Sequence, residues 1–293
     1  MTLPEGIAAL PCWSGEINAE PISGGLSNEI WKITDADGAH VLRLGPDYPF
    51  HHVFRDREAM VARAAHRAGF APEVEYSAPG VMVTAFIEAR TWAAADVRAA
   101  PGRIAEILRG FHQSMASEVS GPAFLFWPFH VVRDYARTLS GSRHAAELAS
   151  YLRLAGEMEA AQIALPIIFG HHDLLPANFL DDGKKLWLID FEYAGFGTAM
   201  FDLAGAASNA GMDEAQATAL MTAYFGAPPA PALVRAFDAM QVASLLRETM
   251  WAMVSDLHLA APGVDYRSYA QENTARLEAA LVNYRAKHGK PRS

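Results

Sequence analysis

The sequence has very little cysteine and no surplus of positive charge, and both shortages narrow what the protein can be. Cys12 is the only cysteine among 293 residues, so no disulfide can form within the chain. This suits a reducing compartment. Lys and Arg number 24 against 33 Asp and Glu, which gives a formal charge of −9. Such a surface repels phosphate backbones and excludes nucleic acid as the expected partner, while it favours a cationic ligand.

Long apolar runs are also missing. No stretch reaches the roughly 18 residues needed to cross a bilayer. The first five residues, MTLPE, show no basic segment followed by an apolar one, which is the pattern of a signal peptide. We therefore expect no membrane partner and a cytoplasmic location. With 51% apolar and 19% charged residues, the composition is typical of an ordinary globular protein.

What the sequence does contain is an ordered polar set in its second half. Residues 171–178 read HHDLLPAN, and residues 188–193 read LIDFEY. Protein kinases use an Asp to accept the proton of the substrate hydroxyl, and an Asn and a second Asp to bind Mg²⁺ on a nucleoside triphosphate. We therefore predict Asp173 as the catalytic base and Asn178 and Asp190 as magnesium ligands. The D-F-E spelling in place of D-F-G favours a kinase of small molecules.

The spacing of these residues predicts a hairpin that brings them together. Residues 178–180 and 186–189 have the pattern of short strands, and Asp182-Gly183 between them is the dipeptide of a two-residue turn. With the turn closed there, Asp190 would lie opposite the catalytic loop. An ordinary acidic hairpin explains any one of these residues, but not the whole ordered set. We expect His171 to brace the loop by hydrogen bonds to the backbone. Neither His171 nor His172 is expected to bind a metal, because no Cys or further His follows at zinc spacing.

Ahead of this motif, the chain is typical of a small sheet with one helix. The expected order is three strands, a helix and two strands, at residues 16–45, 55–68, 74–76 and 81–87. This is the order of the small lobe of a kinase. From Ala93 onward the sequence is rich in alanine and helical in period, with two or three helices expected after Ala199 and a Pro-rich connector at 227–231.

These patterns predict an α+β, bilobal, protein-kinase-like fold. Residues 1–88 would form an N-terminal nucleotide-binding lobe with a small antiparallel sheet and one helix. Residues 89–293 would form a large, mainly helical C-terminal lobe that carries catalysis and substrate binding.

The small lobe contains candidates for binding phosphate. Gly24-Gly25 lies between two expected strands and lets backbone N–H groups approach a phosphate, and Ser27 adds a hydroxyl. A Gly-Gly pair alone is more often a turn, but the downstream magnesium residues change that balance. Arg43 stands where protein kinases place a lysine, and a guanidinium can bind phosphate oxygens as a fork. Glu58 on the next helix is either its partner or a solvated side chain.

Three segments of the chain resemble the choline/ethanolamine kinases, within the wider aminoglycoside-phosphotransferase-like superfamily. They are ISGGLSN at 22–28, the catalytic pair at 171–178 and 188–193, and the C-terminal stretch 250–271. The catalytic pair is typical of the whole superfamily. The D-F-E-Y spelling and the C-terminal stretch favour choline kinases within it.

The resemblance implies ATP and Mg²⁺ as cofactors and a small cationic alcohol, choline or ethanolamine, as acceptor. On the nucleotide side it implies roles for Gly24, Gly25, Ser27, Asn28, Arg43, Glu58 and the interlobe residues Ala85, Phe86 and Ile87. On the substrate side it implies roles for Glu192, Tyr193, Glu248, Trp251, Tyr266 and Tyr269. Aromatic faces suit a quaternary ammonium, which cannot donate a hydrogen bond. Packing in the core would explain Trp251 taken alone.

Glu248 departs from the resemblance, because choline kinases often carry an aromatic residue at that position. A carboxylate suits a primary ammonium, so ethanolamine competes with choline as the expected acceptor. Two alternatives stay open: a kinase of thiamine, an aminoglycoside or a sugar, and a pseudokinase that binds nucleotide without turnover. The intact set of Asp173, Asn178 and Asp190 argues against the pseudokinase.

Overall fold

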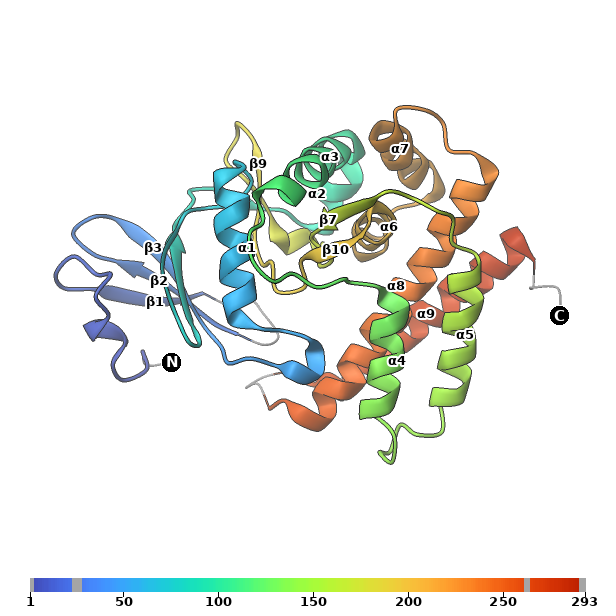
Figure 1. The fold of residues 1–293 in the computed structure, drawn as a ribbon, viewed down its shortest axis with the longest axis horizontal. Coiled ribbons are helices and arrows are strands. Elements are labelled where there is room, and N and C mark those ends of the chain that lie inside the picture. The colour runs from blue at the N-terminus through green and yellow to red at the C-terminus, as the bar shows by residue number, and fades with distance from the viewer. Residues whose placement is uncertain (1–2, 23–27, 261–263, 290–293) are drawn as a thin grey trace.

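The structure is a computed structural model that describes residues 3–22, 28–260 and 264–289. An antiparallel sheet forms one side of the molecule, and a larger, mainly helical body forms the other (Figure 1). This arrangement confirms the expected α+β, kinase-like fold. The exact division into lobes after Glu88 stays a prediction.

The N-terminal sheet has the spatial strand order β1-β2-β3-β5-β4, with antiparallel pairing throughout. Its strands are β1 (Asn18–Ile22), β2 (Glu29–Thr34), β3 (Ala39–Leu44), β4 (Val74–Ala78) and β5 (Val81–Ala85). Helix α1 (Arg55–Arg67) lies between β3 and β4 in the chain and packs against β4. The expected order of three strands, a helix and two strands is confirmed.

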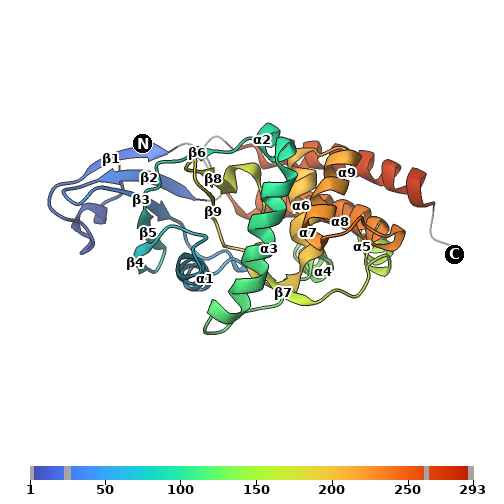
Figure 2. The same cartoon turned by 90° about the horizontal axis from the view of Figure 1, so that it is seen from above.

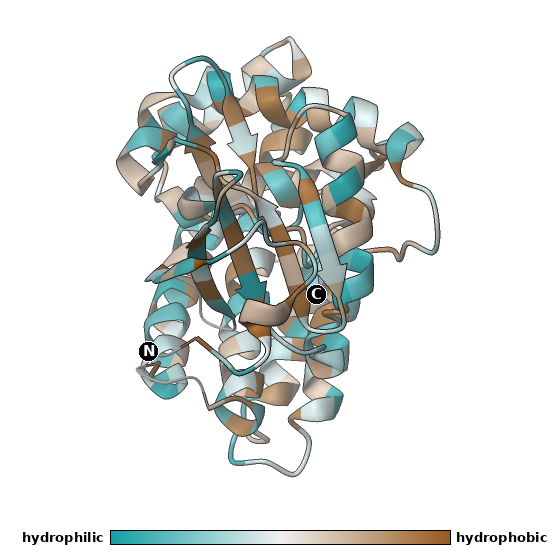
Figure 3. Cartoon of the chain, turned by 90° about the vertical axis from the view of Figure 1, so that its left-hand side faces the viewer, coloured by the Kyte–Doolittle hydropathy of each residue, from teal (hydrophilic) through white to brown (hydrophobic). Residues whose placement is uncertain are grey.

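One face of this sheet has a small apolar cluster of its own. Trp31, Ile33, Leu42 and Val83 alternate with less buried positions along β2, β3 and β5, and they pack with Ile7. This period of two is what a half-buried strand requires. Figure 3 looks onto the sheet, where brown and teal residues share the same strands. The N-terminal segment with its short 3-10 helix (Ile7–Ala9) thus covers this face.

The larger body is built from helices around three small strand pairings. Its helices are α2 (Ala94–Ala99), α3 (Pro101–Glu118), α4 (Pro128–Thr138), α5 (Leu148–Ala160), α6 (Ala199–Ala210), α7 (Glu214–Phe225), α8 (Pro231–His258) and α9 (Tyr266–His288). Its strands are β6 (Arg90–Thr91), β7 (Ile167–Gly170), β8 (Phe179–Asp181), β9 (Leu186–Leu188) and β10 (Gly195–Thr198). Helix α8 is central and packs against α4, α5, α6 and α9 (Figure 2).

The helix count after Ala199 was expected to be two or three, and this was wrong. Four helices lie in the described residues beyond that point. Gly211, with φ 66°, ends α6 and separates it from α7. The Pro-rich connector is confirmed, because α7 ends at Phe225 and α8 begins at Pro231. No helix in the described ranges is both long and apolar enough to cross a bilayer.

The predicted hairpin exists, but its turn is longer than expected. Phe179 pairs with Leu188 and Asp181 with Leu186, so four residues rather than two connect the strands. The Asp182 carboxylate accepts hydrogen bonds from the N–H groups of Lys184 and Lys185, at 2.7 and 2.8 Å. The Asp182 N–H also donates to the Lys185 carbonyl at 3.3 Å, so the side chain and the backbone close the turn together.

The helix of the small lobe shares its core with the helical body. Val61, Ala62, Ala64 and Ala65 on the inner side of α1 are buried in the same apolar cluster as Phe111 of α3. The sheet side and the helical side are therefore joined through α1 and not only through the chain at Glu88.

Candidate active site

The predicted catalytic loop, residues 171–178, follows β7. Asp202 on α6 holds the start of this loop in place. The Asp202 carboxylate accepts the N–H groups of His171 and His172, at 2.8 and 2.7 Å, and a third bond from Nε2 of His112 at 2.8 Å. Burial opposes the charge, but His172 and His112 hold the pKa of Asp202 well below its usual range. Each oxygen is thus bonded by a donor that fixes the loop, as a buried carboxylate requires.

His172 fills a slot that only glycine neighbours permit. Its backbone is left-handed, with φ 63°, and its ring stacks on Phe126 with centroids 4.6 Å apart. A Cβ on Gly170 would lie 2.4 Å from Cε1 of this ring, and a Cβ on Gly197 would lie 2.8 Å from the same atom. The two paired strands β7 and β10 therefore leave room for the histidine, which packs here as a structural residue.

Backbone hydrogen bonds bring the catalytic loop and the β9 end together. The Ile189 N–H donates to the Asn178 carbonyl at 3.2 Å, and Nε2 of His171 lies 3.0 Å from the Ile189 carbonyl. Asp190 then adopts a left-handed backbone with φ 68°, which is uncommon for a residue with a side chain. Asn178 belongs to a 3-10 turn (Pro176–Asn178) rather than to the strand that was expected.

The donor set at this junction fits magnesium. The Asn178 amide nitrogen donates to the Asp173 carbonyl at 2.7 Å, which leaves the amide oxygen as the ligand atom. Asp190 adds a carboxylate, and hard oxygen ligands suit Mg²⁺. The described residues hold no cluster of three or more His, Cys, Asp or Glu side chains that could bind a metal alone. A metal here would share its coordination with phosphates and water, as Mg²⁺ in kinases does.

Asp173 itself is placed beside the acceptor side of the site. It lines a cavity together with Ser244, Arg247 and Glu248 of α8. Burial raises the pKa of Asp173 well above its usual range, and Arg247 opposes that shift. A carboxyl with a raised pKa next to a cavity is a candidate for proton transfer.

The phosphate side is a compact cluster of charges in which Arg43 meets two carboxylates. Its guanidinium forms an ion pair with Glu58 of α1 and donates to Oδ1 of Asp190 at 3.0 Å. Glu58 is 1% exposed, so the pairing holds and the solvated alternative is wrong. In this state the arginine occupies one oxygen of a predicted magnesium ligand.

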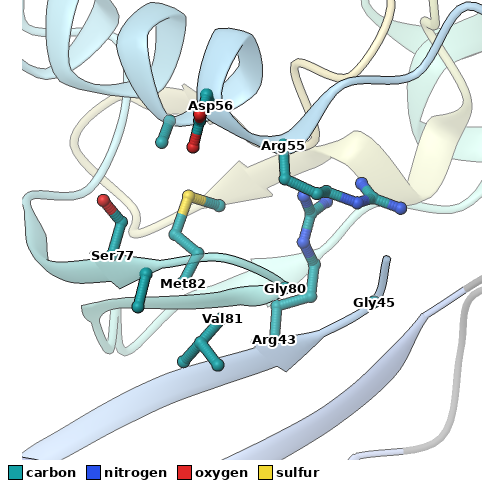
Figure 4. Close-up of a pocket in the computed structure, with 10 residues that line it drawn as sticks. Arg43, Gly45, Arg55, Asp56, Ser77, Gly80, Val81 and Met82 are labelled. Carbon is teal, nitrogen blue, oxygen red and sulfur yellow. The ribbon is translucent and has the colours of Figure 1, made fainter. Parts of the chain in front are cut away.

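A second arginine, Arg55 at the start of α1, completes this cluster. Its Nη1 donates to Glu58 at 2.8 Å and to Glu192 at 3.0 Å. Its Nη2 donates to Asn28 at 2.7 Å, and its Nε donates to the Pro46 carbonyl at 3.0 Å. Figure 4 shows the side chains of Arg43 and Arg55 next to each other at the edge of a cavity between the sheet and α1.

Glu192 is therefore engaged in the charge cluster, where a substrate role was predicted. Burial raises the pKa of Glu192 above its usual value, and Asp190 raises it further, while Arg43 and Arg55 lower it. Its carboxylate links the segment after β9 to helix α1 of the small lobe. The bond to Arg55 uses Oε2, and the substrate role of Glu192 stays a prediction.

Part of the predicted nucleotide site lies outside the described residues. Gly24, Gly25 and Ser27 fall in the gap at 23–27. Asn28 is described, and its Oδ1 is bound by Arg55, so Asn28 is tied to the same charge cluster.

The interlobe segment is extended and partly committed to the sheet. Strand β5 ends at Ala85, so Phe86 and Ile87 lie beyond it and the strand is shorter than expected. The Ala85 and Phe86 N–H groups donate to the carbonyls of Glu73 and Ala39, at 2.9 and 3.1 Å. The carbonyl groups of this segment and the Ile87 N–H remain as candidates for binding adenine, which stays a prediction.

The predicted aromatic residues gather around Trp251. Its Nε1 donates to the Tyr193 hydroxyl at 2.9 Å. The rings of Tyr266 and Tyr269 stand edge-on to it, each with centroids 6.1 Å away. His51 stacks on the Trp251 ring at 5.0 Å. That face is therefore occupied by the protein, and Trp251, at 5% exposed, serves the core as well as the site.

Glu248 connects these aromatic residues to the catalytic cavity. It accepts from the Tyr269 hydroxyl at 2.8 Å and from Nη1 of Arg247 at 2.9 Å. The Arg247 guanidinium lies over the Tyr193 ring, 4.3 Å from its centroid. The structure thus places five predicted substrate residues in one group beside Asp173: Tyr193, Glu248, Trp251, Tyr266 and Tyr269.

Three residues of this site escaped the sequence analysis. Each had a signal, although a weak one. Asp202 is the lone charge in the apolar helix AMFDLAGAASNA. Arg55 places a cation at a helix N-terminus, where the dipole disfavours it. Arg247 interrupts the apolar run of α8.

Known proteins that resemble this chain are phosphotransferases and kinases. A family model described as phosphotransferase enzyme family (APH) matches residues 18–237. A curated protein of Arabidopsis thaliana, named a probable ethanolamine kinase, is 28% identical over 205 residues, which are 64% of this chain and 54% of that protein. The chain thus matches about half the length of this relative.

Among solved structures, a choline/ethanolamine kinase family protein from Mesorhizobium loti is 30% identical, with a TM-score of 0.78 and 96% of both chains covered. The choline kinase LicA from Streptococcus pneumoniae is 18% identical, with a TM-score of 0.74 over 91% of this chain and 94% of its own. A spectinomycin phosphotransferase is 12% identical, with a TM-score of 0.60 over 91% and 94%. At these lower identities the two last structures show a common fold only.

Proposed function

The chain belongs to the phosphotransferase enzyme family and, within it, to the choline/ethanolamine kinase group, and from that premise we propose that it transfers the terminal phosphoryl group of ATP to the hydroxyl of a small ammonium-bearing alcohol. The observation that carries this proposal is the position of Asp173. It lines one cavity with Glu248, and its carbonyl is bonded to Asn178 on the predicted metal side.

In this mechanism Asp173 accepts the proton of the acceptor hydroxyl as the oxygen attacks phosphorus. The raised pKa makes the Asp173 carboxylate a stronger base than an exposed Asp. The positive charge of Arg247 opposes this rise and favours the ionised form of Asp173. Asn178 and Asp190 would hold Mg²⁺, which would neutralise charge on the phosphates when bound. Arg43 would bind phosphate oxygens, and its ion pair with Glu58 fixes its position. Most of the catalysis is then positioning and electrostatic stabilisation.

The acceptor side favours a primary ammonium over a quaternary one. A trimethylammonium needs open aromatic faces, but one face of Trp251 is stacked on His51. Glu248 offers carboxylate lone pairs that only an N–H donor can use. We therefore place an ethanolamine-like amino alcohol ahead of choline, thiamine and aminoglycosides.

A substrate panel tests this proposal. The purified protein with ATP and Mg²⁺ should phosphorylate ethanolamine with a higher kcat/KM than choline, thiamine or an aminoglycoside, as followed by ADP release and by detection of the phosphorylated product. Glu248→Gln should raise KM for the amino alcohol about tenfold, the equivalent of ~1.4 kcal/mol, with KM for ATP nearly constant.

Other outcomes of the panel have distinct meanings. Turnover of thiamine or an aminoglycoside alone would keep the kinase and remove the amino alcohol. ATP binding without turnover of any alcohol would favour the pseudokinase.

A further inference from the structure

Arg247 has a donor edge that no group in the described residues uses. It lies on α8 and is 4% exposed. Its Nη1 donates to Glu248 at 2.9 Å, but its Nε and Nη2 are buried and find no hydrogen-bond partner within residues 3–22, 28–260 and 264–289. Native proteins leave few buried polar groups unpaired, and such a group calls for an explanation.

The two unpaired nitrogens are adjacent on the guanidinium. Nε–H and the N–H of Nη2 point in the same direction, and together they form the edge that binds a carboxylate through two parallel hydrogen bonds. The Tyr193 ring lies against the guanidinium, 4.3 Å from its central carbon, and Glu248 binds the opposite nitrogen. The orientation of the guanidinium is therefore fixed by its neighbours before any ligand arrives.

This edge lies beside the proposed acceptor site, in a cavity of about 10 Å³ that must widen to admit a ligand. Arg247 lines the same cavity as Asp173, Asn209, Ser244 and Glu248. Three carboxylates line that cavity. Asp202 is already bonded by the catalytic loop and His112, while Asp173 and Glu248 suit the hydroxyl and the ammonium of an amino alcohol, and none of the three needs an arginine with two spare donors. A cationic alcohol alone would leave the free edge of Arg247 unpaired and would place two cations in one cavity.

We propose that the acceptor carries a carboxylate in addition to its ammonium and hydroxyl, and that the Nε/Nη2 edge of Arg247 binds that carboxylate. Within the proposed class of ammonium-bearing alcohols, the substrate is then a zwitterionic hydroxy-amino acid. Its ammonium faces Glu248, its hydroxyl faces Asp173, and its carboxylate lies on Arg247. This inference rests on the proposed function, because it assumes that the cavity beside Asp173 is the acceptor site.

The test uses two pairs of probes that differ by one acidic group. L-Serine is ethanolamine with a carboxylate, and L-carnitine is choline with a carboxymethyl group. Binding of all four is measured by calorimetry in the presence of Mg²⁺ and a non-hydrolysable ATP analogue, and turnover is measured with ATP. At least one carboxylated member should bind tenfold or more tightly than its partner.

Arg247→Met keeps the length of the side chain and removes every N–H donor. It should weaken binding of the carboxylated member on the order of 10- to 100-fold, as expected for hydrogen bonds to a charged group. Loss of the bond from Nη1 to Glu248 acts on both members of a pair, so the ratio of the two affinities isolates the contact with the carboxylate. Arg235→Met on the same helix removes an exposed arginine and is the matched control. Should Arg247→Met fail to fold, Arg247→Lys removes the two-pronged edge while it keeps the charge.

The outcomes separate the two proposals. Tighter binding of L-serine or L-carnitine without phosphoryl transfer supports the carboxylate site and removes the proposed function. Turnover of ethanolamine with no preference for a carboxylated probe supports the proposed function and overturns the carboxylate site. The carboxylate site is also overturned if Arg247→Met leaves the ratio of the two affinities within a pair unchanged. Arg247→Lys gives the same test if only that variant folds.

Discussion

Two buried arginines, Arg55 and Arg247, flank the site on its phosphate side and its acceptor side, and they differ in how completely they are paired. All three guanidinium nitrogens of Arg55 have acceptors in Pro46, Asn28 and two glutamates. Arg247 uses one nitrogen out of three. Both are shielded from solvent, so exposure does not explain the difference.

A buried charge can serve the fold or bind a ligand, and its partners decide which. Removing one member of a closed cluster leaves the others uncompensated. A cluster with unpaired donors, such as that of Arg247, already has buried groups without compensation, and a ligand that binds these donors removes that unfavourable energy. Substitutions on the two sides of the site should therefore differ in their effects on stability and on activity.

The acceptor side should lose activity but not stability when Asp173 is changed. Asp173→Asn removes the general base, which is typically worth about 10²–10⁴ in rate, so kcat should fall by that factor while ATP affinity stays constant. Burial holds the pKa of Asp173 above its unfolded value. Stability contributed by this group therefore falls as pH rises between those two pKa values. At neutral pH the uncharged amide removes the cost of burying an ionised carboxylate, so Tm should be unchanged or higher.

Steady-state kinetics and a thermal melt check both parts of this prediction. A kcat close to that of the parent protein would remove Asp173 from the mechanism. A fall in Tm by many degrees would mean that its carboxylate holds the loop.

The phosphate side should respond in the opposite way when Arg55 is changed. Arg55→Leu leaves Glu58 and Glu192 with less compensation in a buried place, and breaking such a cluster costs about 3–5 kcal/mol of unfolding free energy. Urea denaturation measures the loss. Arg63→Leu changes an exposed arginine on the same helix and should cost less than about 0.5 kcal/mol. Equal losses in the two variants would show that the Arg55 cluster is not special.

The smallest effect is expected at Asp190, which belongs to both the charge cluster and the predicted metal site. Asp190→Ala should abolish the increase in ATP affinity that Mg²⁺ causes, a change of about tenfold or ~1.4 kcal/mol. Arg43 keeps Glu58 as its partner, so the fold should hold. Titration of ATP with and without Mg²⁺ gives the result, with Asp56→Ala as an exposed control on α1. If Mg²⁺ still strengthens ATP binding in Asp190→Ala, the metal is held elsewhere.

The sequence predicted the parts of the site that are close together in the chain. Asp173, Asn178 and Asp190 lie within 18 residues, and the hairpin between them follows from strand pattern and turn residues. Its turn was predicted too short, because the Asp182 side chain captures two N–H groups and propensities do not include that bond. The family resemblance is confirmed by the matches reported above.

The parts that the sequence did not predict depend on distant residues. Arg55 meets Glu192 across 137 positions, and His112 meets Asp202 across 90. No periodicity connects such pairs, since only the packed fold places them together. The same holds for Trp251, whose aromatic neighbours were expected but whose stacking on His51 was not. Local pattern predicted which residues carry chemistry, and tertiary packing determined which of them are already occupied.

The position of α1 has a consequence for how the molecule comes apart. Because Val61, Ala62, Ala64 and Ala65 are buried in the core of the helical body, the sheet cannot melt away without exposing part of that body. Heat should therefore disrupt both regions in one cooperative step. The five-residue cluster on the outer face of the sheet stands apart from that core, so its side chains can be exchanged for others of similar volume with little effect on the helical body.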